Sequence, residues 1–415
     1  MTDDSRAEIR NDPRVVRGWA LYDWANSAYF TTTAVALLPT YFASVVVGED
    51  GVSLFGRTYA AESVWALAAS AGAFVLLIAA PILGAVADFS GRKKAFLTAF
   101  AVTGALCATA LSVVGEGDVA LTLTLFLAAQ SCFAVANVFY DGFLPDITTP
   151  ETIDRVSAKG FAYGYLGGGL QFAIAVALLA LHEPLGISTG AAIRVAIAMA
   201  GVWWLGFTVV ALRSFREARR PIGAPAAPRL LAYPRIGLWR VLATIRQVGR
   251  MPHLLLFVLA YVIYNDGVQT VFVVAAVFGT ETLELSAQVI ALTILVVQLV
   301  AFAGAHLFAH LAGCIGPQRT LLVTLVIWTA IAISASLLQT GVPWQFFAVG
   351  GVVGLVQGGT QSLSRSLYAS MIPEAASAEM FAFYSLFSKL SAIGGPLLFA
   401  LVAEGRGPVA PPSSR

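Results

Sequence analysis

Charged side chains stand within stretches that are otherwise apolar enough to lie in a lipid bilayer. Asp23 lies in the run WALYDWANSAYFTTTAVALLPTYFASVVV, Asp266 near the middle of the run 253–278, and Lys389 well inside the run 380–403. A charge at the centre of a membrane span costs about 2.5–3.5 kcal/mol on insertion scales, whereas each Leu, Ile, Val or Phe contributes roughly −0.3 to −0.6 kcal/mol. A handful of apolar neighbours can therefore carry one charge across, and function is the default explanation for such a residue.

The composition indicates a lipid environment for most of the 415 residues. The chain is 58% hydrophobic and only 12% charged, whereas a soluble domain contains about 25% charged residues. Runs of roughly 20 apolar residues span the hydrocarbon core as helices, and the period-2 alternation of membrane strands is missing. We expect an all-α multi-pass membrane protein with eleven spans, at about 18–47, 62–87, 95–114, 119–141, 160–181, 190–212, 253–278, 286–312, 319–339, 343–369 and 380–403.

Basic residues predict the orientation of these spans and the division of the chain. Arg92, Lys93 and Lys94 follow the second run, and nine arginines fill residues 213–252, so these segments and the N-terminus are predicted to be cytoplasmic. The linker 213–252 separates a six-span half, 1–212, from a five-span half, 253–415. Its second part, IGLWRVLATIRQVGR, is typical of a basic amphipathic helix on the inner leaflet.

The two halves share a short repeat. The fourth run ends in YDGFLPD and the tenth in YASMIPE, with the Tyr and the Pro-acid pair at equal spacing. Parallel repeats of six spans are typical of transporters that bind their solute between the halves. A twelfth span is expected by this symmetry, but residues 404–415 read EGRGPVAPPSSR.

The loop GAVADFSGRKKAF between the second and third runs combines several features of a tight helix connection. Gly84 lets two helices approach closely, and Gly91 permits the turn. Asp88 stands at a helix end, where it can bind the N-terminal amides of another helix or an arginine. Arg92 and Lys93 are cations that hold the loop on the cytoplasmic side.

This loop resembles the signature loop of the major facilitator superfamily, although Phe89 stands where that pattern usually has a basic residue. The stretches DWANSA, NVFYDGFLPDI, KGFAYGYLGGG and GGTQSLSRSLYASMIPE are similar to one branch, which contains the yeast vacuolar amino-acid effluxer and many bacterial relatives. The resemblance implies a two-half helical bundle and secondary transport.

The resemblance also implies which spans line the path, namely the first, fourth, seventh and tenth. Asp23, Asp141 and Arg365 are then predicted to form ion pairs across the halves that close the cytoplasmic side; snorkelling or helix capping is the alternative, and it is preferred for Asp146. Asp266 and Lys389, on the seventh and eleventh spans, are predicted to pair as a substrate or proton site, or as a static structural pair. Neutral polar residues expected along the same path are Asn26, Asn137, Asn265, Gln269, Gln357 and Gln361.

Other functional classes lack their motifs. The sequence has no phosphate-binding loop, no GxSxG and no HExxH, so no enzymatic activity, ATP hydrolysis, cofactor or metal is predicted. The net charge of +2 is too small to indicate a nucleic-acid partner. We expect a monomeric carrier in the cytoplasmic membrane that moves an amino acid or similar zwitterion by alternating access, coupled to protons. A non-transporting receptor or assembly scaffold on the same fold is the alternative.

Overall fold

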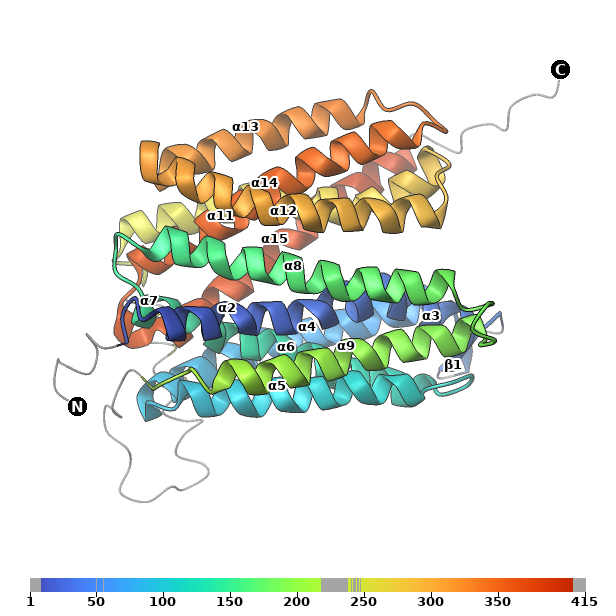
Figure 1. The fold of residues 1–415 in the computed structure, drawn as a ribbon, viewed down its shortest axis with the longest axis horizontal. Coiled ribbons are helices and arrows are strands. Elements are labelled where there is room, and N and C mark those ends of the chain that lie inside the picture. The colour runs from blue at the N-terminus through green and yellow to red at the C-terminus, as the bar shows by residue number, and fades with distance from the viewer. Residues whose placement is uncertain are drawn as a thin grey trace.

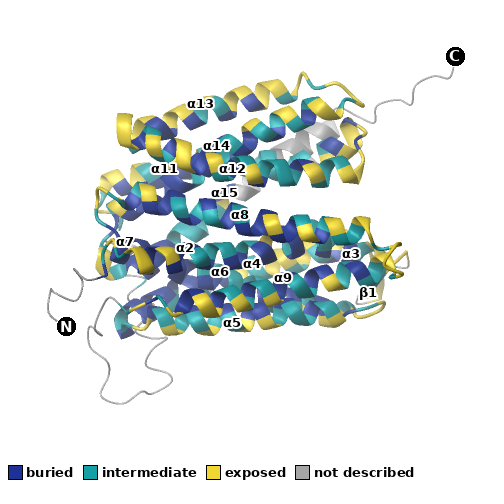
Figure 2. Ribbon diagram, in the orientation of Figure 1, coloured by how far each residue is buried: buried dark blue, intermediate teal, exposed yellow. Residues whose placement is uncertain are grey.

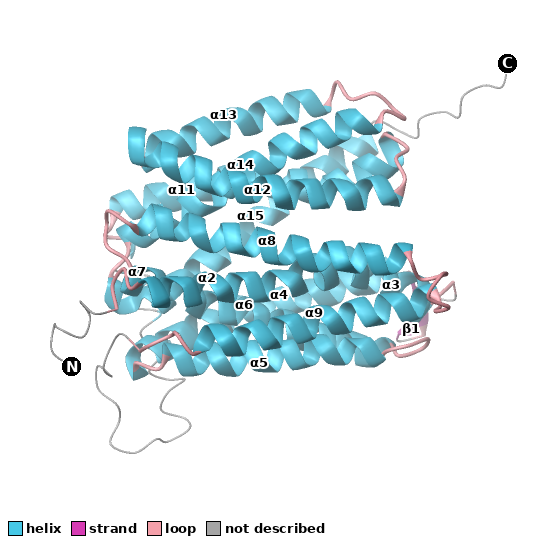
Figure 3. Cartoon of the chain, in the orientation of Figure 1, coloured by secondary structure: helices cyan, strands magenta, loops and turns pink. Residues whose placement is uncertain are grey.

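The computed structural model describes residues 9–49, 51–54, 56–217, 238–239, 241, 244, 246 and 248–405. This part of the chain is almost wholly helical (Figure 3), so the predicted all-α class is confirmed. Its one departure is a short antiparallel hairpin of β1 (Val52–Leu54) and β2 (Arg57–Tyr59), which the sequence did not predict. Most of the linker and residues 406–415 lie outside the described residues, and the predicted amphipathic helix of the linker falls largely there.

The helices form two groups, which we call the N-terminal half and the C-terminal half (Figure 1). The N-terminal half contains α2 (Pro13–Ala28), η1 (Tyr29–Leu37), α3 (Leu38–Tyr41), η2 (Phe42–Val47), α4 (Ala61–Ser90), α5 (Lys93–Ala110), η3 (Leu111–Val113), α6 (Val119–Gly142), α7 (Leu144–Ile147), α8 (Ile153–Ala180) and α9 (Thr189–Leu212). The C-terminal half contains α11 (Pro252–Val277), η4 (Phe278–Thr282), α12 (Ala287–Ile315), α13 (Pro317–Ala335), α14 (Pro343–Met371), η5 (Glu374–Ala376) and α15 (Ser377–Gly405).

Each of the eleven predicted runs coincides with a helix. Within the described residues, nine helical segments are long and apolar enough to cross a membrane by length and composition. The helices α14 and α15 are 29 residues long but fall outside that set. In α14 the reason is polar content, since it carries Gln357, Gln361 and Arg365. The count of eleven spans therefore stays a prediction.

The outer surface of the bundle is apolar, as expected for contact with lipid. Large hydrophobic side chains such as Leu67, Ile263, Val326 and Ile333 are more than half exposed on the long helices. Figure 2 shows such exposed positions along the outer faces of many helices, while the buried residues concentrate where helices meet. A water-soluble surface would not present so many apolar side chains.

The first helix is interrupted by a nine-residue π-helical segment, η1. Pro39 lies just after it and has no backbone N–H to donate to the carbonyl four residues earlier. The chain widens before this point, so the Leu38 N–H reaches the carbonyl of Thr33, five residues back. The segment buries Thr31 and Thr32, which face other helices.

Small residues bring the helices of both halves close together. On α12, a Cβ added to Gly304 would lie 2.0 Å from the Leu355 carbonyl oxygen of α14, and one added to Gly358 of α14 would lie 2.4 Å from the Ala301 carbonyl oxygen. The halves themselves meet where α8 packs on α12 and α14, and where α15 packs on α4 and α6. In Figure 1, α8 lies beside α12 along much of its length.

The close contact at Gly304 gives a test of this packing. Replacing Gly304 with Ala forces α12 away from α14, and overpacking of this kind typically costs about 1–3 kcal/mol. We expect a lower melting temperature for the purified protein in a thermal-shift assay. Gly313→Ala, in the same helix with nothing within 4 Å of the new Cβ, is the matched control. Equal melting of the two variants would contradict the observed packing.

Candidate functional site

Arg365 of α14 is buried between the two halves. It is 3% exposed and lies six residues before α14 ends at Met371. Its Nη1 donates to Asp141 Oδ1 of α6 at 2.9 Å, and its Nε and Nη2 donate to the Ser157 hydroxyl at 3.0 Å and the Ser157 carbonyl oxygen at 2.7 Å. Both partners belong to the N-terminal half. The single guanidinium therefore joins α14 to α6 and α8.

Aromatic rings surround the guanidinium and exclude water from it. The Arg365 Cζ lies 4.0 Å from the Phe161 ring centroid and 4.9 Å from the Trp19 ring. Trp19 stacks on Tyr140 at 4.5 Å and donates its Nε1–H to the Tyr140 carbonyl oxygen. Gly160 leaves space for this arrangement, because a Cβ there would lie 2.6 Å from Trp19 and 2.9 Å from Arg365 Nη2. Desolvated ion pairs and cation–π contacts are stronger than exposed ones.

Asp23 of α2 adds a second carboxylate to this group. Its Oδ2 is buried and has no hydrogen-bond partner in the described structure, and its charge interacts with those of Arg365 and Asp141. A Cβ on Gly164 would lie 3.1 Å from Asp23 Cγ, so α8 covers the carboxylate closely. Asp141 thus binds the guanidinium directly, while Asp23 interacts with it through its charge, and we call Asp23, Asp141 and Arg365 the arginine cluster.

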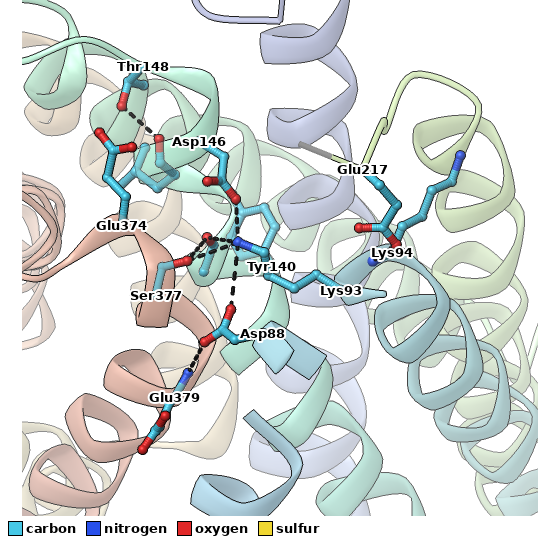
Figure 4. Close-up of polar contacts among 12 residues, drawn as sticks. Asp88, Lys93, Lys94, Tyr140, Asp146, Thr148, Glu217, Glu374, Ser377 and Glu379 are labelled. Carbon is cyan, nitrogen blue, oxygen red and sulfur yellow. Dashed lines mark hydrogen bonds and ion pairs between the residues drawn. The ribbon is translucent and has the colours of Figure 1, made fainter. Parts of the chain in front are cut away.

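A second buried charge group lies between the halves at the same end of the bundle (Figure 4). Lys93, at the start of α5, is 2% exposed, and its Nζ donates to Asp146, to the Gly142 carbonyl oxygen at 3.0 Å and to the Ser377 hydroxyl at 2.9 Å. Asp88 lies 3.9 Å away. We call Asp88, Lys93, Asp146 and Ser377 the lysine cluster.

The signature loop behaves largely as the sequence indicated. Gly91 has φ of 62°, the left-handed conformation that favours glycine. A Cβ on Gly84 would lie 2.7 Å from the Ala378 carbonyl oxygen, so α4 touches the backbone of α15. Asp88 Oδ2 accepts the backbone N–H of Glu379, in the first turn of α15, at 2.9 Å. The carboxylate thus binds a neighbouring helix N-terminus, as its position predicted.

Two expectations for this region are corrected. Asp146 was interpreted as a helix cap near the headgroups, but its side chain is 2% exposed and forms an ion pair with Lys93. Lys93 is predicted to be a cation of the loop, but it is buried at the start of α5. Of the three consecutive cations Arg92, Lys93 and Lys94, only Arg92 is exposed. The short helix α7 follows α6 directly and places Asp146 against Lys93, a consequence of tertiary packing that spacing alone does not reveal.

Outside the clusters, Glu217 follows α9 and accepts the Lys94 N–H at the start of α5 at 2.8 Å. Burial raises the pKa of this carboxyl, while hydrogen bonds from the Lys94 and Ala95 amides oppose that shift.

Four of the six neutral polar residues predicted along the path form side-chain hydrogen bonds with described residues, namely Asn26, Asn137, Asn265 and Gln361. Asn26 donates to Asn137 at 2.6 Å within the N-terminal half, and Asn265 donates to Ser391 of α15 at 2.5 Å. Gln361 accepts the Tyr165 hydroxyl from the other half. Gln269 is partly buried, and the Gln357 side-chain oxygen is buried without a hydrogen bond to a described residue.

Among the described residues no hydrogen bond or ion pair joins Asp266 to Lys389, and their pairing stays a prediction. Asp266 is partly buried on α11, and its neighbour Asn265 contacts α15 through Ser388 and Ser391. Lys389 lines a cavity on the side of α15 that faces α4 and α6. The helical register of α15 therefore directs Lys389 toward α4 and α6.

Sequence reasoning missed several contacts between the halves. Ser157 supplies two of the three hydrogen bonds to Arg365, and Gln298 of α12 donates to Thr31 of η1 at 3.0 Å. Ser and Thr in long helices carry no distinctive signal. The neighbouring small residues that let the helices approach, such as Gly160 and Gly164, were the available clue.

The fold is that of a major facilitator superfamily transporter. The structure matches the human organic anion transporter MFSD10 with a TM-score of 0.65 and 17% identity, covering 94% of this chain and 93% of that one. It matches the proton:xylose symporter XylE with a TM-score of 0.61 and 14% identity, covering 98% and 90%. At these identities the likeness shows the fold alone.

Sequence similarity places the chain more narrowly. Residues 11–412 match the family described as vacuole effluxer Atg22 like, and the chain belongs to this family of membrane transporters. It is 33% identical over 391 residues to the uncharacterized MFS-type transporter YxiO of Bacillus subtilis, covering 94% of this chain and 88% of that protein. It is 23% identical over 403 residues to autophagy-related protein 22 of Coccidioides immitis, covering 79% of this chain and 66% of the fungal protein.

Burial of Lys93 leads to a stability prediction. Lys93→Met leaves the carboxylates of Asp88 and Asp146 buried without their cation, and breaking a buried ion pair typically costs about 3–5 kcal/mol. We expect a marked fall in melting temperature in a thermal-shift assay. Arg92→Met, the adjacent and exposed cation, is the matched control and is expected to melt close to the unaltered protein. A fall of the same size in both variants would contradict the structural role of Lys93.

Proposed function

We propose that this transporter moves a small carboxylate-bearing solute, such as an amino acid or similar zwitterion, across the cytoplasmic membrane by alternating access. The halves 1–212 and 253–415 are the two moving bodies, connected by the linker 213–252. The arginine cluster is the gate that closes the cytoplasmic side. This proposal rests above all on the buried ion pair between Arg365 and Asp141, which joins the two halves.

The position of the polar contacts supports a closed cytoplasmic end. The arginine and lysine clusters and the exposed pair Arg10–Glu374 all connect the halves near the end of the bundle that carries the N-terminus (Figure 1). Positive residues such as Arg14, Arg17 and Arg92 lie at this same end, which favours a cytoplasmic location. The described conformation then has its inner side closed.

The arginine cluster also offers a site for a coupled proton. Two carboxylates and one largely buried guanidinium balance in charge only when one carboxylate holds a proton. Asp141 is bound directly to Arg365, which leaves Asp23 as the carrier. Release of the Asp23 proton adds a negative charge near Arg365. It therefore changes the electrostatic interactions that keep the cytoplasmic side closed.

Loss of the gate pair is expected to open the cytoplasmic side. In a background with Cys107, Cys132 and Cys314 replaced by Ser, Gln361→Cys places a reporter one helical turn beyond Arg365. Adding Asp141→Asn should speed maleimide labelling from the cytoplasmic side by about tenfold or more, because breaking a buried pair costs about 3–5 kcal/mol and each 1.4 kcal/mol is tenfold.

The control for this experiment is Glu374→Gln. It breaks the Arg10–Glu374 pair, which also joins the halves but is 32% and 44% exposed at its two side chains. Exposed pairs contribute little, so labelling should stay near the reference rate. An unchanged rate in Asp141→Asn would remove the gate proposal and would favour a rigid scaffold.

Proton coupling makes a separate prediction at Asp23. With Asp23→Asn, solute-driven acidification or alkalinisation of proteoliposomes should disappear, while exchange of labelled for unlabelled solute persists, because exchange needs no net proton movement. A panel of amino acids and small carboxylates supplies the probes. Glu116→Gln, an exposed acid far from the cluster, is the control. Proton movement that survives in Asp23→Asn would show that another group carries the proton.

A further inference from the structure

A small cavity lies between the halves, apart from the two charge clusters. Its volume is about 280 Å³, and it is lined by Phe74 and Leu77 of α4, Ala134 of α6 and Lys389 of α15, among others. Ligand sites usually measure about 300–1,000 Å³, so this cavity suits a solute of modest size. Because α4 and α6 belong to one half and α15 to the other, its shape changes whenever the halves move.

Lys389 is the unusual feature of this cavity. Its side chain is partly buried, yet its ammonium makes no hydrogen bond or ion pair with any described residue. The remaining described lining is Ala, Leu and Phe, with only the hydroxyls of Ser70 and Ser385. An ammonium held against apolar walls is costly unless an anion accompanies it. Within the described lining, the cavity therefore presents one positive charge beside an apolar surface.

The cavity lies further inside the bundle than the end that the charge clusters close. Toward that end, α15 is pressed against α4 and α6, since a Cβ on Gly84 or Gly142 would lie 2.7 Å or 3.0 Å from the backbone of Ala378. Lys389 is eleven residues further along α15, which corresponds to roughly 16 Å of helix. This places the ammonium near the middle of α15, at a depth suited to a solute site between the halves.

We propose that this cavity is the solute site and that the solute class is a monocarboxylate with a compact apolar body. The carboxylate pairs with Lys389 Nζ, and the hydrocarbon part packs on Phe74, Leu77 and Ala134. Among the described lining residues no carboxylate stands ready for an ammonium group, so the amino group of an amino acid is not required. This inference rests on the proposed transport function and specifies its substrate class.

Binding to the full-length protein in detergent or nanodiscs tests the inference. The probes share one carbon skeleton and differ in charge: 4-methylpentanoate, leucine and 4-methylpentan-1-amine, with decanoate added to represent a membrane-derived fatty acid. We expect 4-methylpentanoate to raise the melting temperature and to bind more tightly than the other three. Lys389→Gln should weaken its binding by about tenfold or more, as expected for loss of a charge-assisted contact, and Lys389→Arg should retain most of it.

Two further variants keep the test decisive. Lys159→Gln, a lysine of α8 outside the cavity, should bind as the unaltered protein does. Ala134→Phe keeps the ammonium but fills the cavity, so it should abolish binding of 4-methylpentanoate, and it decides the matter if Lys389→Gln does not fold.

Equal or tighter binding of leucine would overturn the inference in favour of a zwitterion site, and tighter decanoate would favour a lipid site. Binding unaffected by Lys389→Gln and Ala134→Phe would place the site elsewhere. Any of these results, combined with faster reporter labelling in Asp141→Asn, would leave the transport proposal standing. Unchanged labelling would instead count against that proposal itself.

Discussion

The need to neutralise a buried guanidinium governs how the two halves of this protein meet. Arg365 cannot lose its charge, and in its apolar surroundings it requires a carboxylate and hydrogen-bond acceptors close by. Asp141 and Ser157 supply them from the opposite half. The glycines around it follow from this constraint, since Gly160 and Gly164 allow α8 to approach Arg365, Trp19 and Asp23. The close packing of the helix backbones and the pairing of the buried charges thus depend on each other.

The internal repeat is kept in spacing but not in environment. In the first half its terminal acid, Asp146, is buried against Lys93, while in the second half the corresponding Glu374 pairs with Arg10 at 32–44% exposure. Each half therefore places an acid after a proline at the same end of the bundle, yet only one of them is enclosed. The difference arises because Lys93, just after the α4–α5 loop, lies against Asp146. The start of α15 covers Lys93 through Ser377.

Sequence reasoning succeeded where one helix or one turn decides the outcome. The eleven apolar runs are helical, Gly91 is left-handed, Gly84 marks a close contact, and Asp88 binds a helix N-terminus. It also brought Asp141 and Arg365 together, because both lie near the same ends of spans that the family resemblance puts face to face. It did not bring out the contact partners whose positions depend on rotation about a helix axis.

Lys389 shows most clearly how rotation about a helix axis limits prediction from sequence. The run 380–403 fixes its depth, but whether it faces α11 or α4 depends on how α15 is rotated, and a turn of about 100° per residue separates it from Ser388, which accepts from Asn265. Ser157 and Phe161 were missed for a related reason. Serine and phenylalanine are common in membrane helices, so their role is revealed only by the residues that they contact on another helix.

The two buried cations differ in what separation of the halves would do to them. Lys93 keeps Asp146 and the Gly142 carbonyl within its own half and gives up only the Ser377 hydroxyl. Arg365 leaves behind Asp141, Ser157 and the rings of Phe161 and Trp19, all of which belong to the other half. Water would have to replace these partners of Arg365 when the halves separate. In the proposed opening, hydration of the Arg365 side chain would therefore be the demanding step, whereas Lys93 would keep its ion pair with Asp146.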